Sequence, residues 1–266
     1  MKPIRAVIDP GRVWKFVKRK YGQRGIDKFT PNQSFGGYER LYHVHLRKCA
    51  GTSLNKCFLN ALGGDQDTYE SLASSDTHRL LLEGRPVVGW NTDLLNRSAY
   101  FFGFSHTPIH QLLIDERTFT FTFLRDPVDR VISHYRMLQD MQRARANHPT
   151  VRHEAGWAFG DFDHFLERIP RFHLENQLYM FSADFDVKTA LQALRKLSYV
   201  GHITEIAERF VPRISQIFDL HLEYKPLRKS HFEFEISDAQ KARLISMIDD
   251  EIRFYEAACD EYNLRH

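Results

Sequence analysis

The chain has 266 residues, of which 42% are hydrophobic, and this length and composition suit one α/β domain with a sizeable buried core. Its formal net charge of +3 does not indicate a general nucleic-acid-binding protein. An odd number of cysteines (three), no recognisable signal peptide and no apolar run long enough to cross a bilayer predict a cytoplasmic protein in a reducing compartment.

Positive charge is concentrated at the start of the chain. The basic residues of this segment, which few acidic residues accompany, are Lys15, Lys18, Arg19, Lys20, Arg24 and Lys28. Such a segment is typical of a solvated helix, and it is also suited to guiding an anionic ligand. We expect residues 1–40 to form a basic N-terminal extension packed on a single domain, residues 41–266.

A strand, a short glycine loop and a helix are predicted next. The strand is expected to be half-buried, because apolar residues alternate with histidines: Tyr42, Val44 and Leu46 against His43 and His45. Lys48 and Gly51 end it in a basic loop, and Thr52 and Ser53 are suited to capping the helix that follows. The apolar positions of that helix have helical spacing and are Leu54, Cys57, Phe58 and Ala61.

This arrangement predicts an anion site. Unpaired backbone N–H groups at a helix start, the helix dipole and the ammonium of Lys48 all favour a bound phosphate. An ATP or GTP loop of the Walker A type is not indicated, because Lys48 precedes Gly51 instead of following a second glycine. A cysteine-phosphatase loop is not indicated either, because Asn55 stands where the arginine six residues after Cys49 would be needed.

A second strand and helix carry another candidate phosphate ligand pair. The run Phe119–Leu124 is strongly strand-forming, and Asp126 with Pro127 is a clear helix start. Arg125 at the strand end and Ser133, about two helical turns later, are spaced to converge on one phosphate. Arg125 and Asp126 are equally suited to a local ion pair.

Two later segments have simpler interpretations. Residues 147–160 are polar and punctuated, which predicts either a loop over an active site or a plain surface insertion, and not a core element. From Ser237 onward the sequence opens with a cap and predicts one long amphipathic helix that serves packing. Its apolar positions are Ile245, Ile248, Ile252 and Tyr255.

The segments 47–54 and 124–130 resemble the two phosphate-binding motifs of sulfotransferases that use 3′-phosphoadenosine 5′-phosphosulfate (PAPS) as donor. The first is similar to their 5′-phosphosulfate loop, and the second to their Leu-Arg-(Asp/Glu)-Pro-x-x-Arg pattern. Residues 199–205 and 175–178 resemble two further family segments, in the expected order. The resemblance runs from about residue 41 to the C-terminus. It implies an α/β, three-layer P-loop-like fold, with a central, mainly parallel sheet flanked by helices.

The resemblance also implies donor ligands. Those for PAPS, and for its product 3′-phosphoadenosine 5′-phosphate (PAP), are Arg47, Lys48, Cys49, Ala50, Gly51, Thr52, Ser53, Arg125 and Ser133, with Arg228 and Lys229 of a weakly similar basic turn in second rank. Many relatives read Pro-Lys-(Thr/Ser)-(Ala/Gly)-Gly-Thr in the first motif, whereas Arg47 and Cys49 flank the lysine here. Arg47 is suited either to assisting the lysine or to facing solvent. Cys49, at a helix start beside Lys48, is expected to be an acidic thiol that is open to oxidation.

Lys48 and His106 are the predicted catalytic residues. Sulfuryl transfer needs a cation near the leaving phosphate, for which we choose Lys48, and a base for the acceptor hydroxyl. Family members often carry their catalytic histidine in the interval where His106 ends an aromatic run, and an imidazole titrates near neutral pH. Alternatives for the base are His110, His43, His45 and Asp93. The pair His43 and His45 lacks further metal ligands at suitable spacing, so we predict no metal.

By resemblance, the acceptor is expected to be a hydroxyl of a saccharide. A small natural product, either an alcohol or an amine, remains an alternative. Aromatic residues suited to stacking on either acceptor are Trp90, Tyr100, Phe101, Phe102 and Trp157. A magnesium-dependent kinase and a non-catalytic nucleotide-binding protein are further alternatives.

Overall fold

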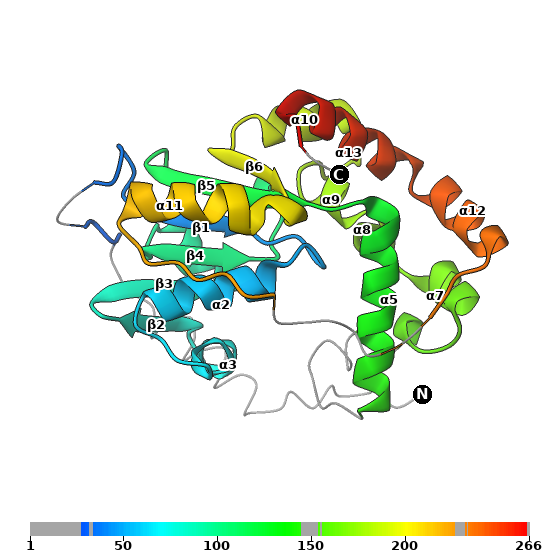
Figure 1. Cartoon of the computed structure of the whole chain (residues 1–266), viewed down its shortest axis with the longest axis horizontal. Coiled ribbons are helices and arrows are strands. Elements are labelled where there is room, and N and C mark those ends of the chain that lie inside the picture. Colours follow the sequence, from blue (N-terminus) through cyan, green and yellow to red (C-terminus); the bar gives the residue numbers. More distant parts are fainter. Residues whose placement is uncertain are drawn as a thin grey trace, which may run out of the picture.

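A six-stranded sheet forms the centre of the computed structural model, which describes residues 28–31, 34–144, 154, 156–226, 232 and 234–264 (Figure 1). The strands are β1 (Arg40–Val44), β2 (Arg79–Leu82), β3 (Arg85–Gly89), β4 (Phe102–Ser105), β5 (Thr118–Leu124) and β6 (Tyr199–His202). Their order is β2-β3-β4-β1-β5-β6, and every neighbouring pair is parallel except β2 with β3. The predicted α/β fold with a mainly parallel sheet is therefore confirmed.

Helices cover both faces of this sheet and give three layers. They are α2 (Gly51–Ala61), α3 (Thr68–Ser74), α4 (Thr92–Asn96), α5 (Pro127–Arg143), α7 (Phe162–Arg168), α8 (Arg171–Leu174), α9 (Asn176–Tyr179), α10 (Val187–Leu194), α11 (Val211–Phe218), α12 (Asp238–Met247) and α13 (Asp249–Tyr262). Short turns of other helical types span Ile109–Gln111, Ile203–Glu205 and Ile206–Phe210. In Figure 1, α2 and α11 lie on one side of the sheet.

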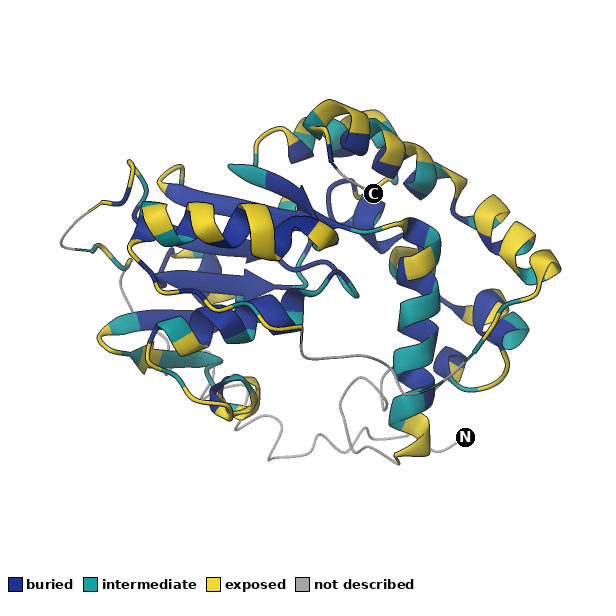
Figure 2. Cartoon of the chain, viewed as in Figure 1, coloured by how far each residue is buried: buried dark blue, intermediate teal, exposed yellow. Residues whose placement is uncertain are grey.

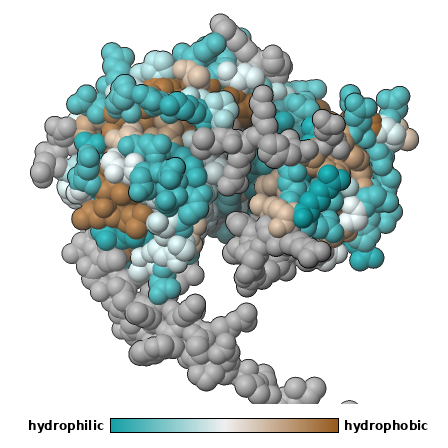
Figure 3. All heavy atoms as spheres, turned by 60° about the horizontal axis from the view of Figure 1, so that its bottom comes forward, coloured by the Kyte–Doolittle hydropathy of each residue, from teal (hydrophilic) through white to brown (hydrophobic). Residues whose placement is uncertain are grey.

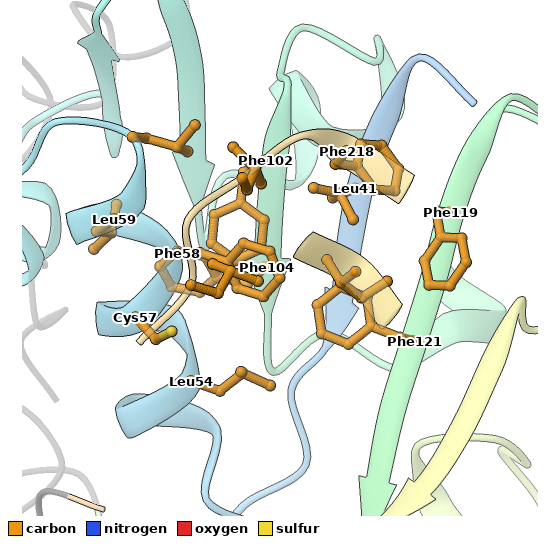
Figure 4. Packing of buried hydrophobic residues seen from close by; sticks show 14 of the residues in the cluster. Leu41, Leu54, Cys57, Phe58, Leu59, Phe102, Phe104, Phe119, Phe121 and Phe218 are labelled. Atoms are coloured by element: carbon orange, nitrogen blue, oxygen red, sulfur yellow. The ribbon is translucent and has the colours of Figure 1, made fainter. Parts of the chain in front are cut away.

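Alternate residues of the central strands enter two different hydrophobic clusters. Leu41 and Phe121 pack with α2 and α11, whereas Tyr42 and Leu124 pack with α9, α10 and α13. Figure 4 shows Phe58 of α2 beside Phe102 in the first cluster, and these two rings are stacked at 4.5 Å. The Phe and Thr alternation of β5 suits a strand whose side chains must point into both layers.

The prediction of a half-buried first strand is wrong, because every residue of β1 is buried (Figure 2). Parallel sheets in α/β folds are covered by helices on both faces, so their central strands are buried throughout. A polar ring at His43 is tolerated there because its Nδ1 is hydrogen-bonded to Asn55 Oδ1 at 2.7 Å.

A third hydrophobic cluster lies beside the sheet and joins α5, α7 and α12. Within the predicted polar insertion, residues 147–153 and 155 lie outside the described part of the chain, but Trp157 and Ala158 are buried in this cluster. The expectation that residues 147–160 are too polar for a core element is therefore wrong in its second half. The aromatic and small residues there supply apolar contacts that the polar average of the segment concealed.

The predicted long C-terminal helix is two helices. Ser237 caps α12 in a capping box with Gln240, as expected. The chain then departs from helical geometry at Ile248 (φ −120°, ψ 24°), and α13 starts at Asp249. The break lets Ile248 join the third cluster while α13 packs its own apolar face on the second.

Large apolar side chains are scattered over the described surface. The most exposed are Leu81, Leu113, Phe172 and Ile245. The face in Figure 3 carries hydrophilic residues over most of its described area, with small hydrophobic patches between them. Isolated apolar residues of this kind are ordinary on a protein surface. At the N-terminal end, Lys28 is ion-paired with Asp115, and the other five basic residues named above lie outside the described ranges.

Candidate functional site

Three candidate site residues follow three neighbouring parallel strands. The loop that carries Lys48 follows β1, His106 follows β4, and Arg125 follows β5. Because β4, β1 and β5 are adjacent and parallel, their carboxyl ends meet at one edge of the sheet. Ligands of open α/β sheets bind at this edge. The fold therefore brings together residues that lie up to 77 positions apart in the chain.

The phosphate loop, residues 47–53, has the backbone of an anion-binding turn. Lys48 (φ 66°) and Ala50 (φ 59°) both adopt the left-handed conformation, and α2 begins directly afterwards at Gly51. Left-handed residues alternating in this way turn successive N–H groups toward one concavity, and the helix start adds positive potential. Local strain at such non-glycine positions is typical of functional loops.

The helix cap differs from the prediction. Ala50 is the N-cap of α2, and no capping hydrogen bond from a side chain is made there among the described residues. Thr52 and Ser53 instead lie within the first turn. The capping interpretation is wrong because the left-handed residue at Ala50 starts the helix earlier, at Gly51, and turns the first N–H groups toward the loop.

Gly51 is in direct contact with the ring of His45. A Cβ atom at position 51 would lie 1.9 Å from Cδ2 and 2.1 Å from Nε2 of His45, so only glycine fits. His45 cannot move aside easily, because its ring stacks on His43 at 5.2 Å and lies 4.1 Å from that of His106. Asn55 of α2 also donates to Nδ1 of His45 at 3.2 Å. The two histidines of β1 thus support the phosphate loop from within the sheet.

His106 is held in the tautomer that a base needs. Its Nδ1 donates to the carbonyl oxygen of His45 at 2.7 Å, which leaves Nε2 as the nitrogen that accepts a proton. Burial, together with the charge of Arg47, lowers the pKa of His106 to about 4, against the opposing effect of the His45 carbonyl. The imidazole is therefore neutral at physiological pH.

Arg125 contacts the phosphate loop directly. Its Nη1 donates to the carbonyl oxygen of Lys48 at 3.3 Å, and its Nε is buried with no hydrogen-bond partner among the described residues. Asp126 does not pair with it, because the Asp126 side chain caps α5 by accepting from Asp129 N at 2.8 Å. A buried guanidinium nitrogen without an acceptor among these residues is suited to donating a hydrogen bond to an anionic ligand.

Gln177 clamps the backbone of Arg125, a contact that sequence reasoning missed. The Gln177 amide accepts from Arg125 N and donates to Arg125 O, both at 2.9 Å. The neighbouring Asn176 accepts from Arg47 N at 3.0 Å. Helix α9 therefore holds both phosphate motifs, and the only sequence signal for this was the likeness of residues 175–178 to a family helix.

The remaining predicted donor ligands fall into three cases. Ser133 lies on α5 and is half-buried, on the helix that starts directly after Arg125. Arg47 does not simply face solvent, because its Nη1 donates to Glu154 Oε1 at 2.7 Å. Arg228 and Lys229 lie outside the described residues.

Cys49 is not the acidic thiol that was expected. Burial raises its pKa to about 12, despite the opposing charges of Arg130 and Arg125. Its Sγ lies 3.6 Å from the carbonyl oxygen of Arg47 and 3.7 Å from Gln177 Oε1. The side chain points into the protein, where desolvation of the thiolate outweighs the helix start.

The four alternatives for the base are less suitable than His106. His43 is buried and bonded to Asn55, and burial lowers its pKa to about 4. His45 is covered by Gly51. His110 is exposed, with its Nε2 3.2 Å from the Tyr179 carbonyl oxygen. Asp93 is exposed in the first turn of α4.

Four of the five aromatic residues predicted to stack on an acceptor are buried in the core, and Trp157 of the third cluster is one of them. Tyr100, Phe101 and Phe102 are at most 1% exposed. Their strand-like run packs between helices, so it cannot present ring faces to a ligand. Among the described residues, no group of three or more His, Cys, Asp and Glu side chains is arranged to hold a metal ion.

A comparison with protein families bears on these observations. A family model described as "Sulfotransferase family" matches residues 37–256. The matched span includes the phosphate loop, the turn at His106 and the Arg125 motif. No curated protein matches the chain.

Proposed function

The chain belongs to the sulfotransferase family, and we propose that it transfers the sulfuryl group of PAPS to a hydroxyl group of a saccharide. The family implies PAPS as donor and favours this enzyme class over the kinase and non-catalytic alternatives. The observation that carries the proposal is the meeting of Lys48, His106 and Arg125 at the carboxyl edge of β4, β1 and β5.

Each residue has a role in this scheme. The backbone of the phosphate loop and the ammonium of Lys48 bind the 5′-phosphosulfate and offset the charge that grows on the leaving phosphate. Nε2 of His106 takes the proton of the acceptor hydroxyl as its oxygen attacks sulfur. The bond between sulfur and the bridging oxygen breaks, and PAP leaves. No metal ion takes part in the proposed transfer.

Arg125 and Ser133 are proposed to hold the 3′-phosphate. A cavity of about 220 Å³ beside α2 is proposed as the place of the nucleoside, because Ser53 of the phosphate loop lines it. Its other lining residues are mostly polar and include Lys56, His221, Glu223 and Lys225. The lining residues belong to α2 and to the chain just before the predicted basic turn at Arg228 and Lys229.

Replacing Arg125 by alanine tests the donor site. We expect PAP to bind the Arg125→Ala variant about ten- to a hundredfold more weakly than the wild type, because a charge-assisted hydrogen-bonding partner of the phosphate is lost. Calorimetry measures this, with ATP and ADP in parallel. The matched control is Arg117→Ala, which removes a half-exposed arginine at the opposite end of β5. Preference for ATP, or no PAP binding at all, would contradict the proposal.

The pH dependence of transfer tests His106. Protonated His106 cannot accept a proton, and its pKa is about 4, so kcat/KM is expected to rise with pH through about 4 and to stay level from pH 6 to 8. An acidic limb near 6.5 would identify a different base.

Thermal unfolding at different pH values is measured alongside, because His43 and His134, like His106, have pKa values of about 4. They take up protons on unfolding, so stability should decline as the pH falls below about 6.5.

The saccharide acceptor is supported by an exposed aromatic side chain that is linked through Tyr179 to the segment after His106. Phe172 is 43% exposed, its ring lies 5.7 Å from that of Tyr179, and Tyr179 contacts His110, four residues after His106. Such rings stack on the apolar face of a sugar. Transfer of radiolabelled sulfate from PAPS to a panel of saccharides, alcohols and amines separates a saccharide from a small natural product.

The cytoplasm remains the proposed location. Cys49, Cys57 and Cys259 are all buried and free of disulfide bonds, which supports a reducing compartment. None of the helices in the described ranges has the length and apolar character needed to cross a membrane.

A further inference from the structure

A buried carboxylate stands behind the phosphate loop. Glu154 is 4% exposed, and its two oxygens face different partners. Oε1 accepts from Arg47 Nη1 at 2.7 Å, and Oε2 lies 3.5 Å from Nε2 of His134 on α5. Glu154 thereby connects the residue before Lys48 to the helix that carries Ser133.

The surroundings of this carboxylate are aromatic. The ring of Trp157 lies 5.7 Å from that of His134 and 5.1 Å from that of His173, and Phe165 closes another side of His134 at 6.3 Å. Only the carboxylate of the pair is buried, since the Arg47 side chain is 24% exposed, and such a pair adds little net stability, because desolvation offsets the attraction. The position of the pair therefore calls for a role other than holding the fold together.

Arg47 is fixed at two points. Its backbone N–H donates to Asn176 at 3.0 Å, and its guanidinium is held by Glu154. A free arginine loses rotamer freedom when it binds an anion, whereas one already held by a carboxylate loses much less. The pair thus holds the Arg47 guanidinium in one position, so less side-chain freedom is lost when a ligand binds.

The charges of Arg47 and Glu154 also act on the pKa of His106. The charged or titratable groups that act on it are Arg47, Glu154 and His43, and the ring of His45 lies against it. Arg47 lowers the pKa of His106 and Glu154 raises it. Burial raises the pKa of Glu154 itself, but the neighbouring His134 ring and the charge of Arg47 outweigh it and lower the pKa, so the carboxyl stays ionised.

We propose that Glu154 is a positioning residue: it holds the guanidinium of Arg47 ready for the donor and balances the charge of Arg47 at the base His106. His134 lies beside the other carboxylate oxygen of Glu154. Neither of them touches the reacting atoms. The effect on donor binding rests on the proposed function, whereas the effect on His106 does not.

A double-mutant cycle in PAP affinity tests the positioning role. In the wild-type background, Glu154→Gln is expected to weaken PAP binding about two- to tenfold, because Arg47 must then be ordered on binding. In the Arg47→Ala background, the same substitution removes only a negative charge, so PAP should bind equally well or more tightly. A weakening of equal size in both backgrounds would indicate a merely structural role, and tighter binding in the wild-type background would overturn the proposal.

Titration of His106 by NMR is the second measurement and needs no donor. Glu154→Gln is expected to lower the pKa of His106 by about half a unit or more, because the charge of Arg47 is no longer offset. The matched control is Glu39→Gln, which removes a buried ion-paired carboxylate at the opposite end of β1. An unchanged pKa in Glu154→Gln would overturn the charge-balancing role, even if PAP did not bind at all.

A second variant guards against loss of folding in Glu154→Gln. Glu154→Asp keeps the charge but shortens the side chain by one methylene group. We expect a smaller weakening of PAP binding than in Glu154→Gln and an unchanged titration of His106. A lowered pKa of His106 in this charge-conserving variant would contradict the proposal, since the charge has been kept.

Discussion

Gly51→Ala is expected to weaken PAP binding by more than about tenfold and to lower the free energy of unfolding by about 2 kcal/mol. The added Cβ would lie 1.9–2.8 Å from three ring atoms of His45. That ring is confined by His43, His106 and Asn55. Relief of the clash therefore displaces the phosphate loop or the support of the base.

Calorimetry with PAP and chemical denaturation measure the two effects. Gly156→Ala is the matched control, because a Cβ there would meet no atom within 4 Å. Removing the ring in the double variant Gly51→Ala with His45→Ala should restore part of the PAP affinity, since the two sites share one space. Wild-type PAP affinity in Gly51→Ala alone would show that the loop does not depend on this contact.

Glu251→Ala is expected to lower the free energy of unfolding by about 3–5 kcal/mol, because it leaves the guanidinium of Arg130 buried without a counter-charge. Both side chains are fully buried, and Arg130 Nε donates to Glu251 Oε1 at 2.9 Å. The other carboxylate oxygen accepts from Gln177 N at 2.8 Å. Since Gln177 clamps Arg125, PAP affinity should fall together with stability.

Urea denaturation of Glu251→Ala measures the loss of stability. Glu256→Ala serves as the control, because Glu256 is exposed on the same helix α13. A paired replacement, Arg130→Met with Glu251→Leu, should be less destabilised than Glu251→Leu alone, because no unpaired charge remains. Equal destabilisation of the double and single variants would show that lost packing, and not the stranded charge, is responsible.

The contacts of Arg125 and Arg130 show how one motif divides between structure and function. In the pattern Leu-Arg-Asp-Pro-x-x-Arg, the first arginine, Arg125, reaches the phosphate loop. The second, Arg130, is buried and binds Glu251 and two carbonyl oxygens near α8. The motif alone did not separate the two roles, because the partner Glu251 lies 121 positions away in the chain.

Local signals were sufficient for the elements that carry the site. The strand before Lys48, the glycine loop, the helix start at Asp126 and Pro127, and the cap at Ser237 all follow from residues within a few positions of one another. Capping and strand pattern are short-range effects, so the sequence predicts these elements, although it misplaced the cap of α2, which is Ala50. The order of the motifs was also enough to indicate the family.

Long-range packing decided what the sequence left open or misjudged. The full burial of β1, the inward turn of the Cys49 thiol and the core position of Tyr100, Phe101 and Phe102 depend on which helices cover which face. The same holds for Glu154, whose partner Arg47 is 107 positions away. Desolvation and ion pairing are set by neighbours in space, and only the tertiary structure determines those neighbours.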